Sequence, residues 1–367
     1  MTRRLEDLAS PYLSGLIPYS PGKPIEEVER EFGISDSVKL ASNENPLGPS
    51  PQSLHAIAGA LAGLHRYPDG GGYALRHALA RHWDVPADCL VLGNGSNELL
   101  ELAGRSFLMP GDEVLYAAQA FVVYDMVAQV TGATKVAVPL KEFAHDLPAM
   151  QAAITPKTKL IFLANPNNPT GTCVDPRVLE AFLGAVPPDV VVVLDEAYYE
   201  YVPPERRPDA LQFVRGGRWL LVLRTFSKIY GLAGLRLGYG MAPAPLVALL
   251  NKVRAPFNTN SLAQVAAAAA LDDTEHVASS RAANDAGRTF LAEQFRRMGL
   301  AVIPSEANFL LVDVGRPGAQ TTEALLRRGV IVRPVGGYGF PTHLRITIGT
   351  ARENETCVAA LKAVLGA

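Results

Sequence analysis

Short apolar runs alternate with helical patterns along most of this chain of 367 residues. From about Ser53 the alternation is typical of an α/β layer, in which strands and helices follow one another. The run at 190–194 is continuously apolar, as expected for a strand that is covered on both faces. We therefore predict a mostly parallel central sheet between helices, with strands at 89–92, 113–117, 134–138, 160–164, 190–194 and 219–223.

The pattern changes near residue 260, where longer helices begin, the longest of them predicted over 278–298. Shorter strands follow, at 307–312, 330–332 and 344–348. The first residues differ again, because they are rich in proline and contain only one short amphipathic helix pattern. We therefore predict an N-terminal arm at 1–35, a large domain at 36–260 and a smaller α+β C-terminal domain at 261–367.

Composition narrows the classes of partner. The net charge is only -2 and the pI is about 6.4, so no strong basic field would attract nucleic acid or an anionic membrane. Cys89, Cys173 and Cys357 lie far apart, which favours neither a disulfide framework nor a metal site. No export signal or membrane-spanning run is present. We expect a cytoplasmic protein that acts on small molecules and uses no metal.

Lys228 is the most informative residue of the chain. It follows the predicted strand at 219–223, with Ser227 beside it and Arg236 eight positions later. An amine at the mouth of a buried strand can form a Schiff base with an aldehyde cofactor, provided that the site keeps it partly neutral. The position therefore predicts a site that uses such a cofactor.

Two neighbouring predicted strands also end in polar residues. Asp195 follows 190–194 directly, at the edge where open α/β sheets bind their ligands. An aspartate there can also cap the next helix, but Lys228 one strand later favours a role in holding the pyridine nitrogen of a cofactor. Asn168 lies in a rigid turn and can donate to a ring hydroxyl or to a substrate oxygen, although turn chemistry alone would also account for it.

A further loop, at 93–98, joins a predicted strand to a predicted helix and is typical of an anion site. The third glycine of a dinucleotide fingerprint is missing, which favours one phosphate over a pyrophosphate. Amides, hydroxyls and a guanidinium for that phosphate would come from Ser96, Asn97, Thr225, Ser227 and Arg236.

Aromatic and basic residues complete the candidate site. Phe121 and Tyr124 can stack on a flat ring, or can simply be core aromatics. Arg333 and Arg345 lie beside the last predicted strands, on either side of a glycine-rich loop at 336–339. A single arginine at a strand end is usually a surface group, whereas this pair indicates a clamp for an anionic substrate.

Four motifs occur in a specific order: Asn-Asn-Pro-Thr-Gly at 167–171, Asp-Glu-Ala-Tyr at 195–198, Ser-Lys with Leu-Ala-Gly-Leu-Arg at 227–236, and Leu-Arg-Ile-Thr-Ile-Gly at 344–349. This order resembles the fold-type I pyridoxal-phosphate aminotransferases, from about Pro18 to the end of the sequence. Within that family the chain is most similar to the histidinol-phosphate aminotransferases, in the segments 41–50, 67–69 and 330–334.

The resemblance implies a role for each matching residue. Lys228 would form the Schiff base with pyridoxal 5'-phosphate and carry the proton between substrate and cofactor. Asp195 would hold the pyridine nitrogen, and Asn168 and Tyr198 would flank the ring hydroxyl. Phe121 would stack on the ring, at a position where tyrosine is common in the family. The phosphate would be held by Ser96, Asn97, Ser227 and Arg236, with Thr225 beside them.

The resemblance also implies a homodimer with shared active sites, because Tyr67 matches a residue that reaches the phosphate of the neighbouring subunit. Arg345 would hold the anionic end of the substrate, and we add Arg333, Asn43 and Tyr19 to the expected substrate site. The implied reaction is transamination between histidinol phosphate and 2-oxoglutarate, with glutamate as product.

Alternatives remain open from the sequence. An aromatic amino acid aminotransferase would use the same chemistry with a different pocket. A pyridoxal-phosphate decarboxylase of phosphorylated amino acids would share the scaffold but release carbon dioxide. A non-catalytic ligand-sensing module would be expected to carry a DNA-binding extension, and the sequence contains none.

Overall fold

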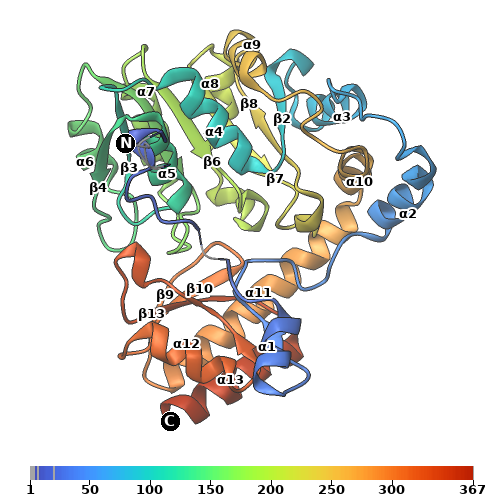
Figure 1. Ribbon diagram of the computed structural model, residues 1–367, viewed down its shortest axis with the longest axis vertical. Coiled ribbons are helices and arrows are strands. Elements are labelled where there is room, and N and C mark those ends of the chain that lie inside the picture. Colours follow the sequence, from blue (N-terminus) through green and yellow to red (C-terminus); the bar gives the residue numbers. More distant parts are fainter. Residues whose placement is uncertain (1–4, 6–7, 20, 367) are drawn as a thin grey trace.

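The computed structural model describes residues 5, 8–19 and 21–366. Its larger part is built on a seven-stranded sheet with the order β2-β8-β7-β6-β5-β3-β4 (Figure 1). The pairs from β7 through β6, β5 and β3 to β4 are parallel, whereas β8 runs antiparallel to both β7 and β2. The strands are β2 (Leu90–Gly93), β3 (Glu113–Ala117), β4 (Thr134–Val138), β5 (Thr158–Ala164), β6 (Val191–Asp195), β7 (Leu220–Thr225) and β8 (Gly238–Met241).

All six strands predicted for this sheet are present, and the mostly parallel α/β architecture is confirmed. The sequence analysis missed β8, whose sequence Gly-Tyr-Gly-Met has the composition of a turn. The reason is steric. A Cβ atom on Gly238 would lie 2.4 Å from the backbone nitrogen of Ser96, so only glycine lets the strand approach the next helix this closely.

The strands of this sheet send alternate side chains into two separate cores. Val191 and Val193 join the core formed with α4 (Ser96–Phe107), α5 (Val122–Thr131) and α9 (Ala244–Val253). Val192 and Leu194 join the opposite core. That core includes α3 (Tyr73–Trp83), α6 (Leu147–Ala152), α7 (Pro176–Ala185), α8 (Leu211–Arg215) and α10 (Ser261–Asp272). Burial on both faces accounts for the continuously apolar strands.

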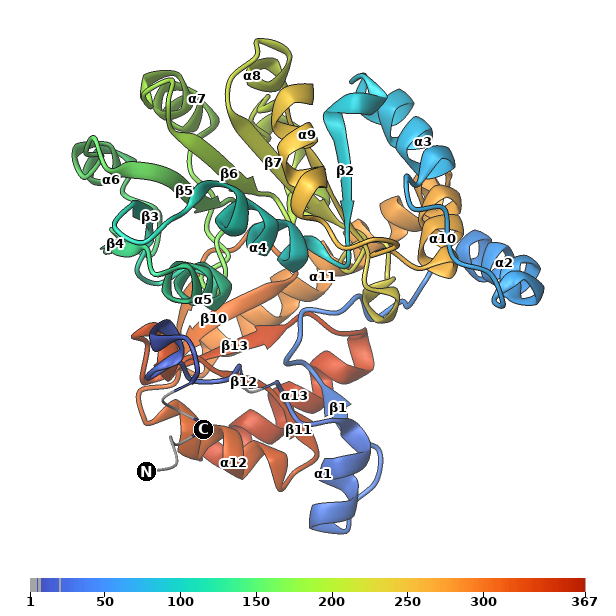
Figure 2. The same ribbon diagram turned by 45° about the horizontal axis from the view of Figure 1, so that its top comes forward.

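The smaller part contains an antiparallel sheet with the order β12-β13-β10-β9. Figure 2 shows this sheet facing the larger part, with helices on its outer side. The strands are β9 (Ala301–Ile303), β10 (Phe309–Asp313), β12 (Arg333–Pro334) and β13 (His343–Thr347), and the helices are α11 (Thr274–Arg297), α12 (Gly318–Leu326) and α13 (Ala351–Leu365). A third apolar core fills the space between them.

Residues 25–39 lie on this smaller part, whereas residues 11–14 pack beside α5 of the larger part. Helix α1 (Ile25–Phe32) packs beside Ile331, and β1 (Val38–Lys39) pairs in parallel with β11 (Val330–Ile331). Helix α10, just after residue 260, packs instead against α2 (Pro51–Ala60) of the larger part. The domain limits at 35 and 260 stay predictions. The contacts of α1 with Ile331 and of α10 with α2 join residues that these limits assign to different parts of the chain.

Two features are absent from the described residues. No helix there combines the length and apolar character that a membrane crossing requires. In the same part of the chain, no three or more His, Cys, Asp or Glu side chains are grouped so that they could hold a metal ion.

A cluster of charged side chains is buried at the ends of β6 and β7. Arg224 is 2% exposed and donates from Nε and Nη2 to Oε2 of Glu196, which is 0% exposed, at 3.0 and 2.8 Å. The carboxylate of Glu200 is buried nearby, and neither of its oxygens has a hydrogen-bond partner in the described part of the chain. Burial raises the pKa of Glu200 to about 7, above its usual value of 4.5.

The raised pKa of Glu200 predicts the pH dependence of stability. Between pH 4.5 and 7 the folded protein keeps a proton that the unfolded chain has lost, so its free energy of unfolding falls as pH rises. Glu200→Gln removes this loss. The change that it causes in the free energy of unfolding should therefore be more favourable at pH 8 than at pH 4, by up to about 3 kcal/mol. Urea unfolding at both pH values, at one protein concentration, measures the difference. The exposed residue Glu205 offers a control, Glu205→Gln, and an equal effect of both variants would contradict the prediction.

Candidate active site

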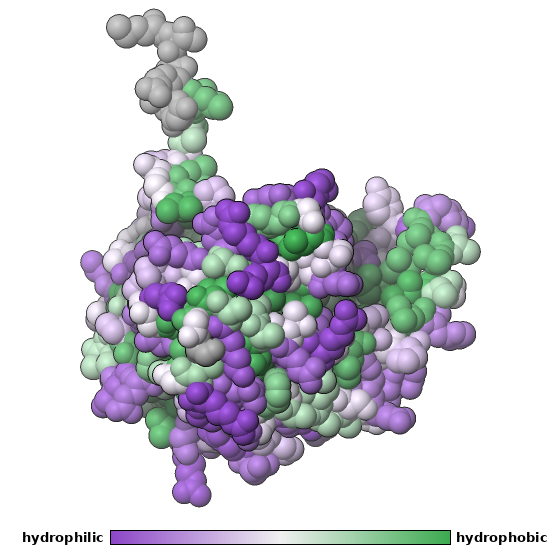
Figure 3. Space-filling model, turned by 90° about the horizontal axis from the view of Figure 1, so that it is seen from below, coloured by the Kyte–Doolittle hydropathy of each residue, from purple (hydrophilic) through white to green (hydrophobic). Residues whose placement is uncertain are grey.

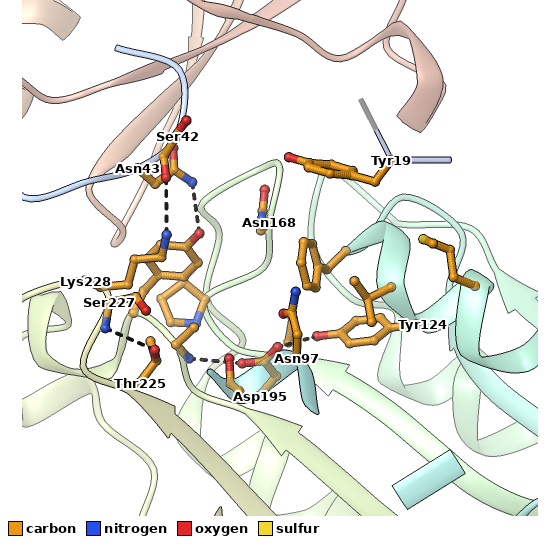
Figure 4. A pocket seen from close by; sticks show the side chains of 18 of the residues that line it. Tyr19, Ser42, Asn43, Asn97, Tyr124, Asn168, Asp195, Thr225, Ser227 and Lys228 are labelled. Carbon is orange, nitrogen blue, oxygen red and sulfur yellow. Dashed lines mark hydrogen bonds between the residues drawn. The ribbon is translucent and has the colours of Figure 1, made fainter. Parts of the chain in front are cut away.

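A cavity of about 360 Å³ lies at the carboxyl ends of β5, β6 and β7, between the larger and the smaller part. It brings together most of the residues predicted from the sequence. Those that line it are Tyr19, Asn43, Ser96, Asn97, Phe121, Asn168, Asp195, Tyr198, Thr225, Ser227, Lys228, Arg236 and Arg345. Figure 4 shows Asp195 and Tyr124 at one side of this pocket and Tyr19 across from them.

Asp195 ends β6 with its carboxylate in the pocket. Its Oδ2 accepts a hydrogen bond of 2.9 Å from the hydroxyl of Tyr124, and its Oδ1 accepts one of 3.2 Å from the backbone N–H of Ala197. Burial raises the pKa of Asp195, and the hydrogen bonds from Tyr124 and Ala197 oppose that rise. The sequence analysis treated Tyr124 only as a stacking or core aromatic. Its contact with Asp195 joins residues 71 positions apart, which no local pattern reveals.

Lys228 lies in the turn after β7, and its Nζ donates to the backbone oxygen of Ser42 at 3.3 Å. Its pKa is lowered from 10.5 to about 8, first by burial and then by the charge of Arg345. The charge of Arg236 acts in the same direction, but its effect is smaller than that of Arg345.

The two parts of the chain are linked across the pocket by polar contacts. Arg345 of β13 donates to Oδ1 of Asn168 at 2.6 Å and to the backbone oxygen of Ala41 at 2.8 Å. Asn43 donates to the hydroxyl of Tyr198 at 2.9 Å. Figure 4 shows Asn43 beside Ser42, above Lys228. The smaller sheet and the N-terminal segment thus help to fix groups at the strand ends of the larger sheet.

The start of α4 brings together groups that could hold an anion. This end of the helix has no side-chain cap, so the N–H groups of its first turn remain available. Arg236 lies close to Gly95, where an added Cβ would come within 2.6 Å of Nη2, and Nη1 donates to Oγ of Ser227 at 3.4 Å. Oγ1 of Thr225 accepts from the N–H of Ser227 at 3.1 Å. These groups lie close together and could donate to one small anion; their role in holding it stays a prediction.

Arg333 lies outside the cavity lining, although it is directly opposite Arg345 in the register of β12 and β13. Its guanidinium is 5.0 Å from the centre of the Tyr19 ring. Tyr338, from the glycine-rich loop, does line the cavity and was missed from the sequence. The loop offered a signal, since Tyr338 is the only side chain larger than hydrogen at 336–339.

Tyr67 is also outside the pocket. It is 82% exposed and stacks on Phe257 with a ring separation of 4.8 Å. Phe121, in contrast, lines the pocket and meets Tyr124 edge to face at 6.0 Å.

Comparison with known proteins places this site in a family. The family model for class I and II aminotransferases matches residues 35–361. The chain therefore belongs to the class I and II aminotransferase family. A histidinol-phosphate aminotransferase from Anaeromyxobacter sp. (strain Fw109-5) is 54% identical over 98% of this chain and 100% of that protein. One from Pseudomonas aeruginosa is 51% identical over 98% of both chains. Within the family, the chain belongs with the histidinol-phosphate aminotransferases.

Solved structures agree with this placement. The histidinol-phosphate aminotransferase of Sinorhizobium meliloti, determined in complex with pyridoxal-5'-phosphate, is 29% identical and superimposes with a TM-score of 0.90 over 98% of this chain and 97% of that one. An aspartate aminotransferase from Thermus thermophilus is 26% identical, with a TM-score of 0.85 over 97% of this chain and 99% of that one.

The lowered pKa of Lys228 predicts how its amine reacts. Acylation by a small amine-selective reagent requires the neutral amine, so the rate at Lys228 should rise through a midpoint near pH 8 rather than near the ordinary value of 10.5. Peptide mass spectrometry over a pH series measures this rate. The exposed Lys362 in the same samples is the internal control, and equal midpoints at both lysines would contradict the prediction.

Proposed function

We propose that this protein is a pyridoxal-phosphate-dependent aminotransferase that transfers the amino group of histidinol phosphate to 2-oxoglutarate. The observation that carries the proposal is a partly buried amine with a lowered pKa, Lys228, which shares one pocket with a buried carboxylate, Asp195, and with Arg345. When bound, the cofactor supplies an aldehyde that reacts with amines and a pyridine ring that withdraws electrons.

The residues of the pocket fit that group. The uncapped start of α4, with Arg236 and Ser227, offers N–H, guanidinium and hydroxyl donors to a phosphate. Gly95 and Gly238 let Arg236 and the start of α4 come close, because a Cβ atom at either position would clash with them. Asp195 offers a carboxylate for the pyridine nitrogen, and the wall formed by Phe121 is flat enough to stack on a ring.

Lys228 acts as the proton carrier of the pocket. With a pKa of about 8, about a tenth of its amine is neutral at pH 7, far more than at the ordinary value of 10.5, so the amine can both accept and return a proton. The hydrogen bonds from Tyr124 and Ala197 to its two oxygens favour the anionic form of Asp195 and oppose the rise in pKa that burial causes. Asn168 and Tyr198 are held in place by Arg345 and Asn43, and so present fixed polar groups beside the lysine.

Arg345 and Arg333 favour a substrate with a strongly charged end. Like charges directly opposite one another on antiparallel strands repel, and an anion between them removes this cost. A phosphate carries more charge than an α-carboxylate, and can accept bonds from both arginines. This supports histidinol phosphate over an aromatic amino acid.

We also propose a homodimer in the cytoplasm. Leu54, Leu61 and Leu64 are each more than half exposed, at the projecting edge formed by α2 and the turn after it. Figure 3 shows this apolar group at the right of the view. Burial of these side chains against a second copy would offset their exposure to water. The three free cysteines fit a reducing compartment.

The substrate assignment predicts a clear preference. With pyridoxal phosphate and 2-oxoglutarate, kcat/KM for histidinol phosphate should exceed that for phenylalanine by about 100-fold, since a charge-assisted contact contributes about 1.5–3 kcal/mol. Formation of glutamate measures the rates. Lys228→Ala should abolish turnover with both donors, and Arg333→Met should lower the rate mainly with histidinol phosphate. Faster turnover of phenylalanine would contradict the assignment, and release of carbon dioxide would contradict transamination.

Shared active sites predict complementation between two defective variants. Lys228→Ala and Tyr67→Ala should each be poor catalysts as homodimers. If Tyr67 serves the partner's site, a hybrid dimer contains one site with both residues intact. Random mixing after unfolding and refolding should then restore about a quarter of the wild-type activity. Activity no higher than that of the parent variants would show that Tyr67 acts within its own subunit or not at all.

A further inference from the structure

The face of the sheet opposite the pocket holds an ion pair that the proposed reaction does not use. Arg224 and Glu196 are both buried, and two donors of the guanidinium, Nε and Nη2, point at the same carboxylate oxygen. The guanidinium is also enclosed by two aromatic rings. Its carbon lies 3.8 Å from the ring centre of Trp83 and 3.4 Å from that of Tyr199.

Stability alone does not account for this pair. Removing two charges from water costs several kcal/mol for each ion, and apolar side chains of similar volume are often as stable or more stable in such places. One oxygen of Glu196 and one nitrogen of Arg224 have no partner in the described part of the chain, so the pair is only partly satisfied. What the pair does supply is a rigid, forked geometry, which apolar contacts do not.

Its position relates that geometry to the pocket. Glu196 follows Asp195, and Arg224 precedes Thr225, so each member of the pair is next to a residue of the pocket on the same strand end. Neighbouring residues of a strand point to opposite faces of the sheet. The ion pair on one face and the pocket groups on the other are therefore joined through a single peptide unit on each strand.

The backbone ladder between β6 and β7 ends at the same point. The last registered pair is Asp195 with Leu223, and the last backbone bond runs from the N–H of Glu196 to the oxygen of Leu223. Beyond it, β7 remains paired only with β8, through Thr225 and Gly238. The bond from Arg224 to Glu196 is thus the side-chain continuation of the ladder, at the point where the turn that carries Lys228 begins.

We propose that the Arg224–Glu196 ion pair is a positioning device. It fixes the distance between the carboxyl ends of β6 and β7, so that Asp195 on one strand meets the same cofactor as Thr225 and Lys228 on the other. The inference rests on the proposed pyridoxal-phosphate site, but not on the identity of the amino donor.

The test separates positioning from folding by comparing variants of the full-length protein. The double variant Glu196→Leu, Arg224→Met removes both charges of the pair together, so neither member is left without its partner. Arg224→Lys keeps the charge but cannot form the fork. Glu200→Gln, in the same cluster but without a bond to Arg224, is the matched control. The measurements are the dissociation constant of pyridoxal phosphate, by absorbance titration of the cofactor-free protein, and the thermal midpoint of that protein.

We expect the double variant and Arg224→Lys to fold and to bind pyridoxal phosphate at least about tenfold more weakly, while Glu200→Gln binds as the wild type does. Residues that orient the ligands of a bound ion contribute about 10- to 100-fold to its affinity, and a similar order applies here. If either variant folds and its dissociation constant is unchanged, the pair is structural only and the proposal is wrong. Should the double variant fail to fold, Arg224→Lys decides the question.

The readout needs cofactor binding and no amino donor. A wild-type protein that binds pyridoxal phosphate but rejects histidinol phosphate would contradict the proposed substrate and leave this test intact. A wild-type protein that does not bind pyridoxal phosphate would overturn both the proposed function and the positioning role.

Discussion

The alternation of side chains along β6 and β7 is the constraint on which the rest of this structure depends. Along the buried part of each strand, both faces receive apolar side chains and the sheet is held between two cores. At the strand ends the same alternation separates polar groups by function. Asp195 and Thr225 face the pocket, whereas Glu196 and Arg224 face the opposite core. The alternation of side chains thus places the pocket residues on one face of the sheet and the Arg224–Glu196 ion pair on the other.

A second constraint is that the pocket is completed by distant segments. Asn168, at the end of β5, is fixed by Arg345 of the smaller sheet, and Tyr198 is fixed by Asn43 of the N-terminal segment. The larger sheet supplies the reactive groups, but the orientation of its asparagine and tyrosine depends on chain that lies far away in sequence. The position of the smaller part relative to the larger therefore sets the geometry of the site as well as its access to solvent.

The sequence predicted features that are local and missed those that are not. Continuously apolar runs such as 190–194 predicted the parallel strands, because burial on both faces leaves a direct trace in composition. Strand β8 was missed because its glycines are required by the close approach of α4, a tertiary contact. The bond between Tyr124 and Asp195 and the pairing of Arg224 with Glu196 were missed for the same reason. Most of the residues predicted for the site line the pocket, and most of these lie within about five residues of the end of a predicted strand.

The positive charges that favour an anionic ligand also lower the pKa of Lys228. Lys228 shares its pocket with Arg236 and Arg345, and both lower the pKa of its amine, in addition to the larger effect of burial. An amine close to other cations is more readily neutral, and cations that outnumber the anions around them attract an anionic ligand. A site that replaced Arg345 with a neutral donor would lose attraction for the substrate and would also leave the lysine more protonated. Substrate affinity and amine reactivity are therefore two consequences of one arrangement of charge.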